Sequence, residues 1–489
     1  MQGFLERIYN LKKRLLIIGC FVLYAAIIIL PALIYHYVYP NNNDDTMGHF
    51  SIIVANGLAN PFKANFIYAG YIYLEYPMLA ISKFLHVNFY TVWVWFNIII
   101  MIPLGYILYY IGTKLINWQT GLLMLFLPTI VSNGLMTYQD SGVIYSMLLV
   151  GLLMPLLILI FVKYWEQKKV WQLVFLFILI IITSTFHTSG VYIPIVAGVS
   201  LCGFLIYKLI KRQKDFKRAT VLGISIIGVS LISIAVLTPQ TFQFVHHLVG
   251  VVSPNVITVI PTQQTTQIDS SRVYSMPVWY WAVSFVSLGI IASIIISIYA
   301  IIKDKIKLSS QVKMYLYILF CWICAMLVLG FGKVSVDPIR AEMDTSIIVA
   351  IFAAILLGSV IIGMKDKTIL IMLAIIVVAC SAETLHLHFQ NNSAVKTADK
   401  EAIVYLNTLD YTNYNCSSTL SYWIYDQLIN EKYSADATDL IVTRNISMTP
   451  RSNATDPTYI AHGYTLNSQD VLIKSFSSGG VTVDIYERE

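Results

Sequence analysis

The chain has 489 residues, of which 57% are hydrophobic and only 12% are charged, and its formal net charge is +6. Soluble globular proteins contain about 25% charged residues, so this low share indicates a chain that lies largely in lipid. The composition therefore excludes a cytosolic enzyme, a disordered scaffold and a nucleic-acid-binding protein, and it predicts a polytopic membrane protein.

About eleven apolar stretches are candidates for membrane-spanning helices, which need about 20 mostly apolar residues. They lie at residues 15–36, 89–112, 119–136, 140–162, 170–186, 188–209, 219–238, 278–302, 311–332, 345–364 and 368–384. The stretches at 119–136 and 170–186 are short, which leaves the count open by one or two. The first stretch lacks a small-residue cleavage site, so we expect a retained helix rather than a cleaved signal peptide.

Basic residues set the expected orientation, because Lys and Arg are enriched in cytoplasmic loops. Four of them precede the first stretch, which places the N-terminus in the cytoplasm. The cytoplasmic segments then hold about 20 Lys and Arg, and the outer segments before residue 385 hold about five. The densest run is KLIKRQKDFKR at 208–218. A wrong number of spans would scramble this bias, so the uneven distribution supports the predicted spans. We therefore interpret the positive net charge as a topology signal.

The chain changes character near residue 385. We expect a transmembrane domain at 1–384, with outer loops at 37–88 and 239–277, and an extracytoplasmic domain at 385–489. In this tail ADKEAIVYLNTL predicts a helix, DLIVTR and GVTVDIYE predict strands, and SSGG predicts the turn of a hairpin. The expected fold class is an all-α polytopic membrane protein with a small C-terminal α/β domain.

Ionisable residues at the margins of an apolar bundle are costly, so their placement is informative. A mixed set falls on the predicted outer side, whereas the spans hold nothing comparable apart from Glu383 near the end of the last one. The set comprises Asp44, Asp45, His49, Glu75, Asp140, His187, Arg272, Lys333, Asp337, Arg340, Glu342 and Asp344. A proton- or ion-coupled transporter needs carboxylates near the membrane midplane. The outer face is therefore the expected active surface.

The segment YPNNNDDTMGHFSIIVANGLANP follows the first predicted span. Asp45 and His49 are four residues apart, so they share a face if a helix begins here. In one interpretation Asp44, Asp45 or Thr46 caps an interfacial helix. In the other, a carboxylate at the membrane rim accepts a proton or binds a metal. A cap needs only one of the two aspartates, so the two interpretations are compatible.

Two short motifs resemble the GT-C superfamily, which comprises multi-pass membrane glycosyltransferases that use polyprenyl-phosphate-linked sugars. They are Asp45-Thr46-Met47-Gly48-His49 in the first outer loop and Glu75-Tyr76-Pro77 downstream. The many spans, long outer loops and C-terminal domain also match the layout of this superfamily over nearly the whole chain. ADKEAIVYLNTL, with the final VTVDIYE strand, resembles the tail of prokaryotic members. The sequence lacks W-W-D-Y-G, which argues against an oligosaccharyltransferase, and its first loop lacks Asp-x-Asp, which leaves metal dependence open.

The resemblance implies a role for the first loop in sugar transfer. Asp45, which matches the first-loop acid of the family, would be the general base for the acceptor hydroxyl. Asp44 and His49 would orient it or hold a divalent cation, Mg²⁺ or Mn²⁺. These three residues are the candidate catalytic group and the candidate metal ligands.

The departing lipid phosphate needs positive charge or hydrogen-bond donors, and the planar fork of arginine binds two phosphate oxygens at once. Arg340 in KVSVDPIRAEMD is the preferred candidate, and Lys333 and Arg272 are second choices. A snorkelling arginine paired with a nearby carboxylate explains Arg340 equally well.

Three more candidates lie in apolar surroundings. His187, near the outer end of its span, either contacts phosphate or sugar hydroxyls or is a buried histidine bonded to Thr183 or a carbonyl. Glu75 is a candidate second carboxylate of the site, and Tyr76 belongs to a tyrosine cluster that is either an interfacial belt or a surface that stacks on sugar. Glu75-Tyr76-Pro77 also fits the start of a helix with proline in its first turn. The loop at 239–277 is a candidate lid over the donor site.

We therefore expect an enzyme of a prokaryotic cell membrane that transfers a sugar outside the cytoplasm. Its partners would be the polyprenyl-phosphate sugar donor, membrane lipids, and a glycan, lipid or protein acceptor, with no nucleic acid. A flippase or exporter of lipid-linked glycan is the first alternative. A polymerase or ligase of surface polysaccharide is the second, and a membrane sensor would leave the first-loop cluster unexplained.

Overall fold

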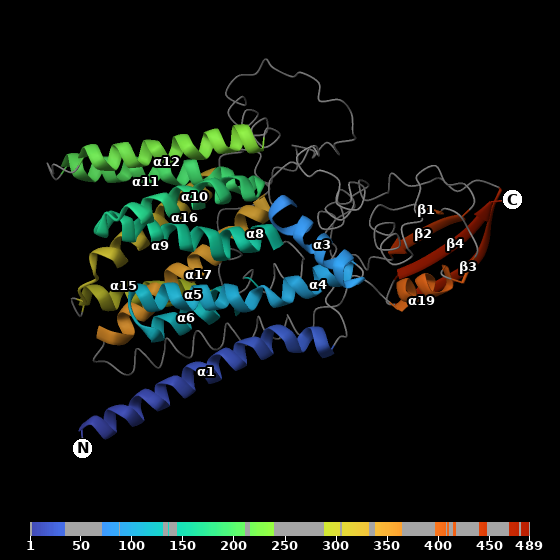
Figure 1. Ribbon diagram of the computed structural model, residues 1–489, viewed down its shortest axis with the longest axis horizontal. Coiled ribbons are helices and arrows are strands. Elements are labelled where there is room, and N and C mark those ends of the chain that lie inside the picture. The colour runs from blue at the N-terminus through green and yellow to red at the C-terminus, as the bar shows by residue number, and fades with distance from the viewer. Residues whose placement is uncertain are drawn as a thin grey trace, which may run out of the picture.

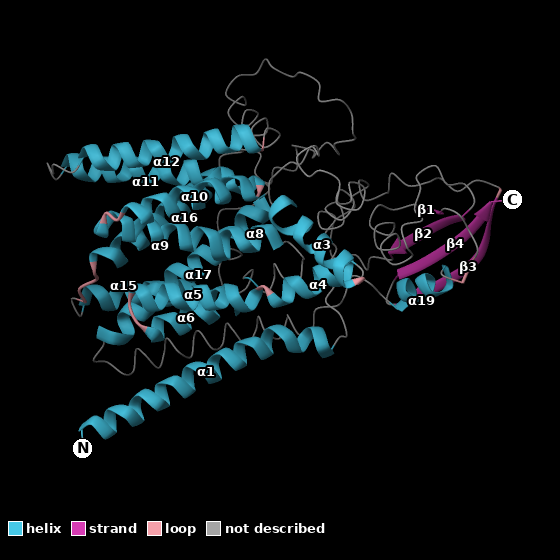
Figure 2. Cartoon of the chain, in the orientation of Figure 1, coloured by secondary structure: helices cyan, strands magenta, loops and turns pink. Residues whose placement is uncertain are grey.

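The computed structural model describes most of the predicted helical part and the core of the C-terminal domain. The described residues are 2–34, 71–87, 89–130, 135, 144–210, 216–238, 288–303, 306–331, 338–363, 397–406, 408–409, 414–416, 440–446, 469–478 and 481–488. Helices form a bundle up to residue 363, and a sheet with one helix follows it, as Figures 1 and 2 show. The predicted fold class, a helical membrane protein with a small C-terminal α/β domain, is confirmed.

The bundle contains long helices and several short ones. They are α1 (Gln2–Ile34), η1 (Tyr71–Glu75), α3 (Tyr76–Leu85), α4 (Phe89–Ile99), α5 (Met101–Leu115), α6 (Trp118–Ile130), α8 (Ile144–Leu148), η2 (Leu149–Leu153), α9 (Met154–Gln167), α10 (Val170–Phe186), η3 (Thr188–Val191), α11 (Tyr192–Ile210), α12 (Phe216–Leu237), α15 (Leu288–Lys303), α16 (Ser310–Phe331) and α17 (Pro338–Gly363). Among the described residues, six helical stretches are long and apolar enough to cross a membrane, and shorter apolar helices accompany them. Described helices lie within the other predicted spans, in full or in part, whereas the span at 368–384 falls outside the described residues.

Proline explains where two predicted spans are irregular. Proline lacks an N–H, and its ring clashes with the carbonyl four residues earlier in a helix. The helix that begins at α4 is interrupted at Ile100, three residues before Pro103, although the Ile100 N–H still donates to the Phe96 carbonyl at 2.9 Å. In the same way, the π-helix η2 ends at Leu153, two residues before Pro155 in the first turn of α9. The span continues through both irregularities.

Helix α17 forms the centre of the bundle and packs against α6, α15 and α16 (Figure 1). Its side chains from Asp344 to Val360 are buried with hardly an exception. The contact with α6 is close because Gly358 has no side chain: a Cβ there would lie 2.1 Å from Thr120 Oγ1. Asn117 caps α6, since its Oδ1 accepts hydrogen bonds from the Thr120 N–H and hydroxyl at 2.8 and 2.9 Å.

Helix α1 lies at the edge of the bundle, and most of its apolar side chains are exposed, as expected for a helix that faces lipid. Its buried Tyr24 fixes it to the bundle. The Tyr24 hydroxyl donates to the Met101 carbonyl at 3.0 Å, and the ring occupies the space beside Gly105, where a Cβ would come within 2.6 Å of it.

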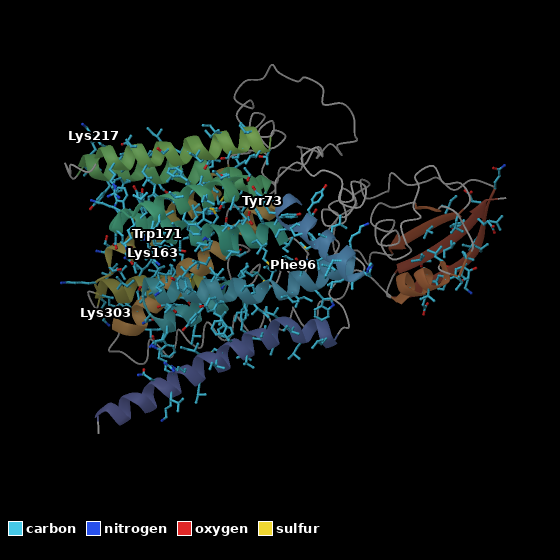
Figure 3. All side chains as sticks on the ribbon, in the orientation of Figure 1. Tyr73, Phe96, Lys163, Trp171, Lys217 and Lys303 are labelled. Carbon is cyan, nitrogen blue, oxygen red and sulfur yellow. The ribbon has the colours of Figure 1, made fainter. Side chains whose placement is uncertain are left out.

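The two ends of the bundle differ in composition. Lys163, Lys217 and Lys303 lie at one end and Tyr73 lies at the other, as Figure 3 shows. The three lysines come from three segments that the sequence assigns to the cytoplasmic side, so their common location is what the expected orientation requires. We call their end the basic end. Its location in the cytoplasm remains a prediction.

The C-terminal sheet has the strand order β1-β2-β4-β3. Its strands are β1 (Tyr414–Cys416), β2 (Leu440–Ile446), β3 (Asp470–Ser478) and β4 (Val481–Arg488), and helix α19 (Thr397–Leu406) packs on β3 and β4. β1 and β2 are parallel, and the other neighbours are antiparallel. Ser478 pairs with Val481, which confirms the predicted hairpin, and the predicted helix and strands are confirmed as well. The domain boundary at 384/385 lies outside the described residues.

Candidate active site

Among the described residues two carboxylates are buried: Asp344 in α17 is 0% exposed, and the other is Glu75, at the end of the bundle opposite the basic end. It is the last residue of the π-helix η1 and precedes α3, with Pro77 in the first turn of that helix. This confirms the predicted start of a helix at Glu75-Tyr76-Pro77. Only 1% of Glu75 is exposed. π-Helical turns are rare and occur frequently at functional sites, and a buried carboxylate needs hydrogen-bond donors.

Tyr145 supplies such a donor from a distant part of the chain. Its hydroxyl donates to Glu75 Oε1, and its side chain is 2% exposed. Tyr145 lies in α8, directly before the second π-helix η2. Tyr145 is not among the predicted site residues, since a tyrosine inside an apolar span carries no distinguishing signal.

His187 reaches the same cluster from the end of α10. Its backbone is extended, its side chain is 3% exposed, and its Nδ1 accepts a hydrogen bond from the Ser189 N–H at 3.2 Å. The Ser189 hydroxyl lies 3.1 Å from the same nitrogen. A nitrogen that accepts a backbone N–H carries no proton of its own, so these bonds assign the ring proton to Nε2. His187 is thus buried, as one interpretation expected, but Nδ1 is bonded to Ser189 rather than to Thr183, whose hydroxyl donates to the Leu179 carbonyl.

Aromatic rings join the three polar residues into one cluster. The rings of Tyr145 and His187 are stacked, with centroids 6.1 Å apart and planes at 12°. Phe186 meets Tyr145 edge-on at 5.9 Å and stacks on Tyr73 at 6.2 Å. Such pairs fix ring orientations as well as burying area. We call Glu75, Tyr145 and His187 the polar cluster.

A glycine holds the turn that presents His187. The Gly190 N–H donates to the His187 carbonyl at 2.8 Å within η3. A Cβ at Gly190 would lie 2.4 Å from the Ser184 carbonyl oxygen and 2.6 Å from that of Thr183. Only glycine allows this close approach of the turn to the end of α10.

Tyr76 is next to the cluster and is 8% exposed, so it is a buried side chain rather than part of an exposed tyrosine belt. Burial raises the pKa of Tyr76, and the negative charge of Glu75 raises this pKa further. The phenol therefore stays neutral over the physiological pH range and can donate a hydrogen bond.

Asp44, Asp45, His49, Arg272 and Lys333 lie outside the described residues, and Arg340 lies in the first turn of α17, where only the backbone is described. Helix α17 begins at Pro338, earlier than the predicted 345, because proline favours the first position of a helix. Within the described residues, no group of three or more His, Cys, Asp or Glu side chains has the arrangement of a metal site.

The comparisons with known proteins place this geometry in a known fold. No protein-family model and no curated protein matches the sequence. Solved structures of the oligosaccharyltransferase AglB from Archaeoglobus fulgidus are similar. The complex with an inhibitory peptide and a dolichol-phosphate has a TM-score of 0.55 and 11% identity, over 88% of this chain and 69% of that one. The apo form has a TM-score of 0.53 and 13% identity, over 85% and 64%. The complex with Zn and sulfate has a TM-score of 0.53 and 11% identity, over 87% and 67%.

The chain shares its fold with these oligosaccharyltransferase structures. The expected resemblance is therefore confirmed for the architecture. The chain spans 64–69% of the length of these similar structures. At 11–13% identity the likeness is one of fold.

The polar cluster has the chemical groups to hold a carbohydrate or a phosphate. A carboxylate such as Glu75 accepts hydrogen bonds from sugar hydroxyls, and an imidazole with its proton on Nε2 donates to an oxygen. Because these groups are buried and oriented by neighbours, their interactions with a ligand are stronger than in water.

Proposed function

We propose that the protein is a GT-C-type glycosyltransferase that moves a sugar from a polyprenyl-phosphate-linked donor to an extracytoplasmic glycan, lipid or protein. The observation that carries the proposal is the buried polar cluster of Glu75, Tyr145 and His187 at one end of a bundle with the GT-C fold. A buried carboxylate and histidine are costly in a membrane protein and typically serve function.

In this proposal the acceptor hydroxyl attacks the anomeric carbon of the sugar while the bond from that carbon to the phosphate oxygen breaks. Asp45 takes the proton of the hydroxyl as general base. Arg340, with Lys333 and Arg272, stabilises the negative charge on the departing lipid phosphate. Glu75 accepts hydrogen bonds from hydroxyls of the donor sugar, Tyr76 contacts the same substrate, and His187 donates from Nε2 to the sugar or phosphate.

The similar structures support the proposed partners. One of them contains a dolichol-phosphate and an inhibitory peptide, which supports a lipid-phosphate donor and a peptide as one class of acceptor. Another contains Zn and sulfate, which supports a divalent cation. We propose Mg²⁺ or Mn²⁺ at Asp44, Asp45 and His49, where the cation would neutralise phosphate charge.

The test is sugar transfer in membranes supplied with radiolabelled polyprenyl-phosphate sugars, with wild type and Asp45→Asn at matched protein level and insertion. Loss of a general base is expected to lower transfer by about a hundredfold or more. Unchanged transfer in Asp45→Asn would reduce Asp45 to a helix cap and overturn its role. If wild type transfers sugar from none of the donors, the activity itself is wrong and a flippase becomes the better explanation.

A further inference from the structure

The basic end of the bundle contains a feature that sugar transfer does not require. Helices α9, α10, α11, α12 and α16 enclose a cavity of about 110 Å³ with an almost entirely apolar lining. Along α9 the lining extends from Met154 to Trp165, which is about 16 Å at the helical rise per residue. A cavity this long and narrow has the shape of a single hydrocarbon chain rather than of a ring system.

The positively charged side chain of Arg218 lies at the end of the cavity nearest the basic end. The Arg218 guanidinium is 4.8 Å from the ring centroid of Trp165, and Trp165 lines the cavity. It is also 5.5 Å from the Tyr164 ring, and its Nη2 donates to the Tyr164 carbonyl at 3.4 Å. Ala219, the next residue, lines the cavity as well. The faces of these aromatic rings thus hold the positive charge of Arg218 at the end of the apolar cavity.

The surroundings of Arg218 are basic. Lys217, Lys168, Lys169 and Lys313 are exposed at the same end, where Glu166 is an exposed acidic neighbour whose carboxylate accepts from the Gln311 amide. A guanidinium has five N–H donors, so one contact with a carbonyl leaves donors for two phosphate oxygens. The apolar cavity and the Arg218 guanidinium at its end together complement a molecule with a hydrocarbon chain and an anionic headgroup.

We propose that this cavity binds one acyl chain of an anionic phospholipid of the adjacent leaflet, with the lipid phosphate on Arg218. The headgroup position at Arg218 lies beside Lys217 at the basic end, opposite the polar cluster, so the proposed ligand is a phospholipid and not the sugar donor. Such a lipid fills space between α9, α11 and α12 and couples stability of the bundle to the anionic lipid content of the membrane.

The test uses purified, delipidated full-length protein and phosphatidylglycerol or phosphatidylcholine with identical brominated acyl chains. Bromine atoms in the cavity quench Trp165, and the Trp165→Phe variant identifies that share of the quenching. Wild type is expected to bind phosphatidylglycerol about fivefold more tightly than phosphatidylcholine, the factor for one basic residue at a membrane surface. Equal binding of the two lipids would overturn the headgroup assignment.

Three variants test the headgroup part of the site. Arg218→Gln is expected to remove the preference for phosphatidylglycerol, and Arg218→Lys to keep most of it. Lys303→Gln is the matched control, because Lys303 lies over Tyr299 at 5.6 Å at the same end, away from the cavity, and it should keep the preference. Retention of the preference in Arg218→Gln, or its loss in Lys303→Gln, would overturn the assignment to Arg218.

The chain position has its own test. Ala197→Leu places a larger side chain in the cavity lining and should abolish the Trp165-dependent quenching. Gel filtration and the unfolding midpoint without lipid establish that each variant is folded. If Ala197→Leu does not fold, Ser200→Leu is a second variant that fills the cavity. Persistent quenching in a folded, filled variant would overturn the proposal. Displacement of phosphatidylglycerol by lower concentrations of polyprenyl phosphate would do so too, because the site would then belong to the donor.

Discussion

The two ends of the helical bundle handle ionisable side chains in opposite ways. Glu75 and His187 are 1% and 3% exposed and lie in a network with Tyr145. At the basic end Lys217 and Lys303 are exposed and Lys163 is half-buried, and Arg218 lies against aromatic faces. Burial of a charge is costly and exposure is not, so the first arrangement indicates chemistry and the second indicates orientation and lipid contact.

The strongest test of this contrast removes one carboxylate from each end. Glu75→Gln is expected to lower sugar transfer by about 10- to 150-fold, which corresponds to about 1.5–3 kcal/mol for a hydrogen bond to a charged group. Glu166→Gln is the matched control, since this exposed carboxylate at the basic end is bonded to Gln311, and its transfer rate should stay within about twofold. The measurement is the initial rate of transfer at saturating acceptor.

Tyr145→Phe extends the comparison, because it removes the phenol that donates to Glu75 but keeps the aromatic stack with His187. It should lower transfer less than Glu75→Gln does, and it should lower the unfolding midpoint. If the two glutamate variants behave alike, burial does not distinguish the ends and Glu75 has no role in the substrate site.

The next prediction concerns the turn that carries His187. Gly190→Ala places a Cβ 2.4 Å from the Ser184 carbonyl oxygen, a backbone atom fixed by α10, so the turn must move. We expect destabilisation of about 1–3 kcal/mol and loss of transfer, because His187 moves with the turn. Thermal unfolding in detergent, followed by tryptophan fluorescence, measures the first effect.

Gly198→Ala on the neighbouring helix α11 is the control. The nearest side-chain atom to a Cβ there is Ile227 Cδ1 at 4.0 Å, an ordinary contact. Its unfolding midpoint should be unchanged or slightly raised, since alanine stabilises a helix interior more than glycine does. Equal midpoints for Gly190→Ala and wild type would show that the turn tolerates displacement and does not define the position of His187.

Much of the fold was predictable because hydrophobic stretches and alternating strands are local signals. The spans, the SSGG hairpin and the helix at Thr397–Leu406 all follow from composition and periodicity within short windows. The start of α17 at Pro338 was missed, since a polar helical extension outside the apolar stretch has no hydropathy signal.

The site was predictable only in part. Glu75 and His187 stood out because an ionisable residue in apolar sequence is conspicuous. Their partners did not: Tyr145 meets Glu75 from 70 residues away, and only helix packing determines that pairing. Ser189, which orients His187, resembles any serine in a turn. The run at 208–218 was interpreted as a topology signal alone, because the contact of Arg218 with Trp165 is likewise a tertiary one.

The smallest expected effect concerns Tyr76 beside the polar cluster. Its pKa is raised above the ordinary value of 10.0 by burial and by Glu75, so the folded state keeps the phenol proton at pH values where the unfolded chain loses it. The resulting stability is fully present below about pH 10 and is lost as the pH rises through the higher folded pKa.

Tyr76→Phe removes this titration, so its unfolding midpoint should not show that part of the alkaline decline of wild type. Unfolding midpoints between about pH 8 and pH 11 measure the difference, and Tyr73→Phe serves as the control on the same segment because Tyr73 is 37% exposed. If Tyr73→Phe removes the decline and Tyr76→Phe does not, the alkaline sensitivity does not arise from burial beside Glu75.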